Sequence, residues 1–140
     1  MDRIPSFNKD HTKIKPGFSL SGVNNGISTF DLRFIKPNGG KYLSYPAIHS
    51  IEHMMATVLR NGKQKSNIVY FGPMGCRTGF YLLTINLDEN TVKKMVSDAA
   101  KICLELNGVP GCAEAECGNY LEHDISEAKK ELTKYIKETL

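Results

Sequence analysis

The segment from Pro46 to Gly62 constrains the fold most strongly, because its apolar residues recur at the spacing of an α-helix. Proline suits the first turn of a helix, and Asn61-Gly62 supplies a stop signal. The apolar stripe consists of Ile48, Ile51, Met55, Val58 and Leu59. A helix with such a stripe has to bury it, so another layer of structure is expected to pack against it.

Two later segments also predict helices. Asn90 is expected to cap one that ends at Asn107-Gly108. Its buried stripe is expected to be Val92, Met95, Val96, Ala99, Cys103 and Leu106. Asp124 and Glu127 have the spacing of a capping box, which predicts a last helix running toward Leu140. Its inward residues are expected to be Ile125, Ala128, Leu132 and Ile136.

The strands are predicted from a different period. Between Ser28 and Ile35 apolar and polar residues alternate, which predicts a half-buried strand. Its apolar face is expected to hold Phe30, Leu32 and Phe34, and its other face Asp31 and Arg33. Further strands are expected at residues 67–71 and 80–87, whereas the chain up to about residue 27 is expected to be an arm and loops with at most one short strand.

The resulting order is strand, helix, strand, strand, helix, helix. It predicts an α+β fold in which helices pack on a mainly antiparallel sheet, in a single domain over residues 1–140. A net charge of +3 without a basic run argues against nucleic acid as a partner. The sequence has neither a signal peptide nor an apolar stretch long enough for a membrane, so a cytoplasmic location with reduced cysteines is expected.

The sharpest chemical signal is His49-Ser50-Ile51-Glu52-His53. Residues four apart on a helix share a face within one turn, so His49 and His53 can bind one divalent metal. Glu52 lies at the edge of the same face, where a carboxylate can move protons. The same order of residues is also found in inverted zinc peptidases, which are therefore a rival interpretation.

Two cysteines lie in glycine-containing loops. Cys76 is in the turn Pro73-Met74-Gly75-Cys76-Arg77-Thr78-Gly79, between two predicted strands, which makes it a candidate acid, base or nucleophile. Cys117, followed by Gly118, is a plausible third metal ligand, and a third ligand leaves the fourth position open as in catalytic zinc sites. Spacing does not exclude Cys112 from this role. As a fourth ligand it would instead give a closed structural zinc module.

These segments together resemble the S-ribosylhomocysteine lyase family, often called LuxS. The resemblance covers nearly the whole chain, and its pieces occur in family order. They are Ser6-Phe7, Asp10-His11, Phe30-Asp31-Leu32-Arg33-Phe34, Pro37-Asn38, Ile48 to His53, Pro73 to Tyr81, Cys117-Gly118, His123-Asp124 and Glu127-Ala128-Lys129. Any one piece is weak, whereas the full set in this order is highly specific.

The resemblance implies a metal held by His49, His53 and Cys117, usually Fe²⁺ and replaceable by zinc or cobalt. It also implies that Glu52 and Cys76 transfer protons. The lyases of this family release homocysteine and the precursor of the autoinducer-2 signal. They are homodimers with active sites at the interface. Ser6, His11 and Arg33 are therefore expected to bind the substrate, S-ribosylhomocysteine, with the first two acting across the dimer.

The sequence departs from the commoner family pattern just before the cysteine turn. Many members have Asp-Ile-Ser before Pro-Met-Gly-Cys, whereas this chain has Tyr70-Phe71-Gly72. A phenol thus replaces a carboxylate, and a hydroxyl is lost. The proposed metal and proton-transfer residues are all retained. His123 precedes a predicted helix start, where a structural or capping role is expected rather than ligation.

Overall fold

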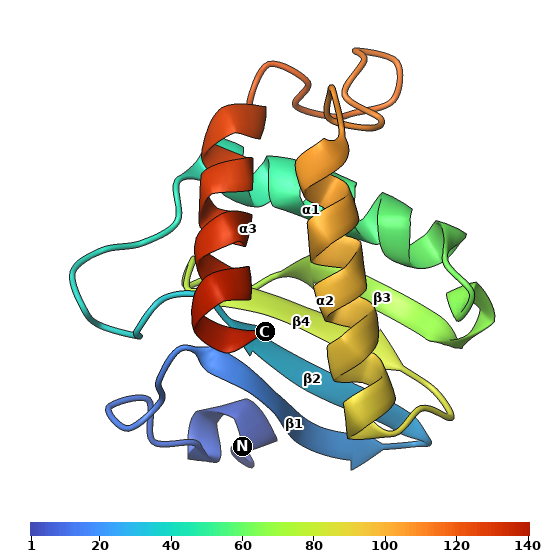
Figure 1. The fold of residues 1–140 in the computed structure, drawn as a ribbon. Helices are drawn as coiled ribbons and strands as arrows, with labels where there is room; N and C mark the ends of the chain where they lie inside the picture. The colour runs from blue at the N-terminus through green and yellow to red at the C-terminus, as the bar shows by residue number, and fades with distance from the viewer.

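The computed structural model describes residues 1–140. Two 3₁₀ turns, four strands and three α-helices follow one another along the chain (Figure 1). Their bounds are η1 Pro5–Asn8, β1 Gly17–Asn24, β2 Ile27–Arg33, α1 Tyr45–Asn61, η2 Lys65–Asn67, β3 Ile68–Pro73, β4 Gly79–Thr84, α2 Glu89–Glu105 and α3 Ile125–Thr139.

The four strands form one antiparallel sheet in the order β1-β2-β4-β3. All three helices lie on one face of it, with α2 and α3 side by side and α1 running across them (Figure 1). The predicted α+β fold with helices on an antiparallel sheet is therefore confirmed.

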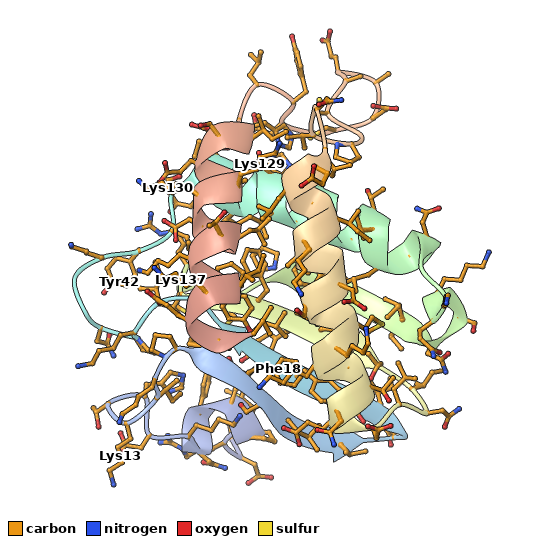
Figure 2. All side chains as sticks on the ribbon, in the orientation of Figure 1. Lys13, Phe18, Tyr42, Lys129, Lys130 and Lys137 are labelled. Carbon is orange, nitrogen blue, oxygen red and sulfur yellow. The ribbon has the colours of Figure 1, made fainter.

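The core lies between the sheet and the helices. Phe30 and Leu32 of β2 and Phe80 and Leu82 of β4 are fully buried there, because strand residues two apart share a face. Figure 2 shows Phe18 of β1 on the helix side of the sheet, where its ring stacks on that of Phe30 at 5.4 Å. The period-two pattern predicted this apolar face correctly.

The prediction for the N-terminal part of the chain was too cautious. β1 has eight residues and pairs with β2 along its length, with a register shift between Leu20 and Gly22. Only three of its residues are even half-buried, so it lacks the alternation that identifies a strand in sequence. Its main-chain pairing with β2, a contact between separate segments, defines it instead.

The helix boundaries are as expected except at α2. Ser44 caps α1, and Gly62 follows its last residue. The N-cap of α2 is Asp88, whose carboxylate accepts from the Thr91 N–H, so the prediction of Asn90 was wrong. The helix also ends at Glu105, before the predicted Asn107-Gly108 stop.

The other face of the sheet is also partly closed. Asp31 and Arg33 of β2 point away from the helices, yet they are only 5% and 2% exposed. They form an ion pair with 2.6 Å between the Arg33 Nη2 and Asp31 Oδ2 atoms. The expected half-buried strand is thus buried on both faces at this point. None of the helices is long and apolar enough to cross a membrane.

Candidate metal centre

Three imidazoles and one thiol converge where α1 meets the connection between α2 and α3. The side chains are His49, His53, Cys117 and His123, and their candidate ligand atoms all lie within 4.8 Å of one another. Both α1 histidines are on the face opposite the buried stripe, as their spacing predicted. The connection, residues 106–124, places Cys117 and His123 against that face.

The distances within the group fit a tetrahedral metal site. Cys117 Sγ lies 3.4 Å from His49 Nε2, 3.9 Å from His53 Nε2 and 3.6 Å from His123 Nε2. Metal–sulfur and metal–nitrogen bonds of about 2.3 and 2.0–2.1 Å give a tetrahedral S–N edge of about 3.6 Å. These residues therefore form a group able to hold a divalent metal.

The α2–α3 connection also orients the two α1 rings. His49 Nδ1 lies 2.9 Å from the Glu122 carbonyl oxygen, and His53 Nδ1 lies 2.9 Å from the Pro110 carbonyl oxygen. A carbonyl oxygen only accepts, so each ring donates its Nδ1–H and keeps a free lone pair on Nε2. Both Nε2 atoms lie near the sulfur, in the tautomer that metal ligation requires.

The sequence interpretation gave His123 a structural or capping role, and the capping part was wrong, because the residue lies in the donor group. Its ring stacks on that of His49, with 3.9 Å between centroids, and its Nε2 lies beside Cys117. Asp124 is the residue that caps α3, accepting from the Glu127 N–H. Burial, together with the electrostatic effect of the adjacent His49 and His53, lowers the pKa of His123, which favours a neutral ring.

The other two cysteines lie outside this group. Cys112 is half-buried in the connection and is not among the four clustered donors, so it does not complete a closed four-ligand site there. Cys103 of α2 is fully buried beside Met55, and burial raises the pKa of its thiol to about 12. It is part of the core, as its position on the apolar stripe predicted.

A second polar cluster surrounds Cys76 in the turn between β3 and β4. Cys76 is an exposed residue, and its sulfur lies 3.0 Å from Thr78 Oγ1 and 3.9 Å from Nη1 of Arg33. Arg33 also donates to Thr78 Oγ1 at 2.8 Å and is held by its ion pair with Asp31. The turn therefore presents its thiol to solvent beside two buried polar partners.

Main-chain bonds place this turn at the beginning of α1. The Leu43 N–H donates to the Arg77 carbonyl oxygen at 3.0 Å, and the Arg77 guanidinium lies over the ring of Tyr45, 4.6 Å from its centroid. Arg77 has a positive φ of 60°, so the turn is tight here. Cys76 is thereby held close to the end of α1 that carries His49. Glu52 is half-buried on the same helix, and its carboxylate makes no hydrogen bond within the chain.

Ser6 and His11 lie in the N-terminal segment, at the opposite end of the fold from the metal group of the same chain. In Figure 1 the N-terminal segment is at the bottom of the view, whereas the α2–α3 connection is at the top. Ser6 is in η1, and His11 Nδ1 lies 2.9 Å from the Lys9 carbonyl oxygen. Arg33 and Lys9 line a polar cavity of about 280 Å³ on the sheet. The structure thus does not join Ser6 or His11 to the metal group of the same chain.

The two departures from the family pattern are linked in space. Tyr70 and Gly72 lie on the same side of the edge strand β3, and the phenol covers Gly72. A Cβ atom at position 72 would overlap the Tyr70 ring. The missing side chain at Gly72 therefore makes room for the large one at Tyr70, which is 47% exposed.

The fold and this group define a small α+β protein with a candidate metal site of three histidines and one cysteine. The family model described as S-ribosylhomocysteinase (LuxS) matches residues 4–140. Curated relatives named S-ribosylhomocysteine lyase are similar over nearly their whole length. The one from Borreliella burgdorferi (strain ZS7) is 42% identical over 98% of this chain and 92% of its own.

A second relative of the same name, from Desulfotalea psychrophila, is 42% identical over 100% of this chain and 92% of its own. A third, from Phocaeicola vulgatus, is 41% identical over 100% of this chain and 91% of its own. The chain therefore belongs to the S-ribosylhomocysteinase (LuxS) family of enzymes. The resemblance inferred from the motifs is confirmed.

Proposed function

We propose that the chain cleaves the thioether of S-ribosylhomocysteine to homocysteine and 4,5-dihydroxy-2,3-pentanedione, the autoinducer-2 precursor. The observation that carries this proposal is the donor group on α1 and the α2–α3 connection, in a chain of this family. Sulfur leaves by β-elimination only when the adjacent carbon can lose a proton, and that proton is acidic only beside a carbonyl. The carbonyl must therefore migrate along the ribose by successive enolisations before the elimination.

His49, His53 and Cys117 are the proposed metal ligands, because their Nε2 and Sγ atoms approach one another with the tetrahedral edge lengths given above. The metal, proposed to be Fe²⁺ with zinc or cobalt as substitutes, supplies a Lewis acid for the sugar oxygens when bound. The backbone carbonyls of Pro110 and Glu122 hold both imidazoles in the ligating orientation.

Cys76 and Glu52 are the proposed proton-transfer pair. Each enolisation removes a proton from one carbon and returns one to its neighbour, so groups on both sides of the sugar are needed. The sulfur of Cys76 has hydrogen-bond partners in the Thr78 hydroxyl and the Arg33 guanidinium. These partners orient it and support negative charge on it between proton transfers. Glu52 is one residue before His53, so the helical spacing puts it at the edge of the face that carries the two histidines.

A homodimer is proposed because one chain does not assemble all the expected substrate-binding residues. Ser6 and His11 lie away from the metal group of their own chain (Figure 1). The same N-terminal segment exposes Ile4 and Phe7, at 53% and 64%, which an arm packed on a second copy would cover. Arg33 is proposed to contact the substrate from the polar cavity on the sheet.

One observation favours a second candidate, a structural zinc module. The donor group contains four side chains, the number that a closed zinc site uses. The fourth is His123 rather than the expected Cys112. An inverted zinc peptidase has less support, since this group contains no carboxylate.

The test is turnover of S-ribosylhomocysteine by anaerobically purified, iron-containing protein, followed with a thiol reagent that reports homocysteine. The lyase assignment predicts rapid thiol release by the native chain, and almost none by Cys76→Ala with its metal content unchanged. Native protein that holds stoichiometric metal and releases no homocysteine would favour the structural module. Cleavage of a peptide would favour the peptidase.

A further inference from the structure

His123, the fourth member of the donor group, differs from His49 and His53 in its hydrogen bonding. His49 and His53 direct Nδ1 at backbone carbonyls, whereas His123 directs Nδ1 at the side-chain hydroxyl of Ser50, 3.1 Å away. A carbonyl oxygen accepts only, but a hydroxyl both donates and accepts. The tautomer of His123 therefore depends on how the Ser50 hydroxyl is used.

The second partner of Ser50 settles that question. Its Oγ atom accepts the main-chain N–H of Asp124 at 2.9 Å, and these two contacts are the only hydrogen bonds of the hydroxyl. Ser50 is 0% exposed, so no solvent is available to its proton. If His123 also donated to Oγ, the hydroxyl hydrogen would be buried without an acceptor, which is costly. The proton of Ser50 accordingly points at His123 Nδ1.

A neutral imidazole that accepts at Nδ1 carries its hydrogen on Nε2. That nitrogen lies 3.6 Å from Cys117 Sγ, within reach of an N–H···S hydrogen bond. We infer that His123 is not a fourth metal ligand but a positioning residue that donates Nε2–H to Cys117, in a tautomer imposed by Ser50. This inference rests on the proposed ligand set and not on the lyase reaction itself.

This assignment reconciles four clustered donors with an open catalytic site. Two rings offer lone pairs from Nε2, and the third offers a proton, so three ligands remain and one metal position stays free for substrate. A hydrogen bond to the thiolate also withdraws charge from sulfur, which leaves the metal a stronger Lewis acid. The structural zinc module requires the opposite tautomer at His123.

The direct test is nitrogen NMR of the histidine rings in the full-length, zinc-loaded protein. The expected spectrum has His49 and His53 with protonated Nδ1 and zinc-shifted Nε2, and His123 with protonated Nε2 and an unprotonated, unmetallated Nδ1. A protonated Nδ1 together with a zinc-shifted Nε2 at His123 would overturn the inference. Because no substrate is used, this result is independent of whether the protein turns over S-ribosylhomocysteine.

A second measurement uses the sulfur-to-metal charge-transfer band of the cobalt-loaded protein. Loss of an N–H···S bond raises the energy of the sulfur electrons, so His123→Phe is expected to move the band to longer wavelength. Ser50→Ala should give part of this shift and Ser50→Thr, which keeps the hydroxyl, should restore the native band. An unchanged band in His123→Phe, or a spectrum showing a lower coordination number, would contradict the assignment.

Discussion

The candidate metal centre joins two regions of very different construction. α1 is a regular helix whose buried face is anchored in the core, and it presents His49 and His53 at fixed positions one turn apart. The α2–α3 connection has no helix or strand between Glu105 and Ile125. It nevertheless supplies Cys117, His123 and both carbonyls that orient the α1 rings.

The difference shows that the helix and the connection contribute different things to the site. The helix gives precision, because its backbone geometry is set by local hydrogen bonds and by packing of its apolar stripe. The connection gives chemistry that a helix cannot supply, namely free carbonyl oxygens and a thiol brought in from a distant part of the chain. We expect loss of a ligand from either region to abolish metal binding, and the other changes in the connection to disturb the orientation of the ligands.

The largest effect is expected from loss of an α1 ligand. His53→Ala should abolish stoichiometric metal binding and, with it, turnover, while the helix remains folded because its buried stripe is intact. Metal content by mass spectrometry and helix content by circular dichroism check this. Cys117→Ala is the matched change in the connection and should also lose the metal. Full metal retention in either variant would remove that residue from the ligand set.

Loss of a proton carrier should cost somewhat less. Glu52→Gln keeps the size of the side chain but not its basicity, so kcat should fall about 10²- to 10⁴-fold with metal content unchanged. Cys76→Ala should behave in the same way. Steady-state release of homocysteine measures both. A kcat within about tenfold of native for either variant would exclude that residue from general acid–base catalysis.

A substitution at a glycine of the connection that has a positive φ should give an intermediate effect. Gly111 has φ +65°, and a Cβ there would contact the Nδ1 of His53 at 3.5 Å. Gly111→Ala is therefore expected to cost about 1–2 kcal/mol of stability and to weaken metal affinity about tenfold, by moving the Pro110 carbonyl. Gly26→Ala, at φ +76° with open space around its Cβ, is the matched control. It should destabilise the protein similarly and leave metal affinity unchanged.

The smallest expected effect comes from the helix caps. Asp88 caps α2 and Asp124 caps α3, each accepting from the N–H three residues later. Replacing either with Ala should lower the Tm by about 3 °C. Only Asp124→Ala should also perturb the metal site, because loss of the cap lets the backbone at this residue shift, and its main-chain N–H, which Ala retains, bonds to Ser50. Equal metal affinities in the two variants would show that the cap and the site are independent.

The contrast between these regions also explains what the sequence could predict. His49, Glu52 and His53 follow from helical spacing, which is a local property. The proximity of His123 depends on its contact with Ser50, which is far away in sequence, and no local pattern encodes it. The family motif included His123-Asp124 but carried no structural reason for it.

The sheet gives the same lesson. The apolar face of β2 was predicted from alternation, whereas burial of Asp31 and Arg33 on the other face was not. These charges are compensated because they form an ion pair with each other, and Arg33 also donates to Thr78 in the β3–β4 turn. β1 was underestimated because its exposed, polar residues lack a period. The steric pairing of Tyr70 with Gly72 likewise depends on how the Tyr70 ring lies over the strand, which no sequence pattern encodes.

The central claim is that α1 and the connection hold one metal with three protein ligands and leave a position free. A crystal structure of the zinc-loaded protein tests it most directly. It should place zinc about 2.0–2.1 Å from the Nε2 atoms of His49 and His53 and about 2.3 Å from Cys117 Sγ, with solvent in the fourth position. His123 Nε2 bonded to zinc in that fourth position would contradict the account.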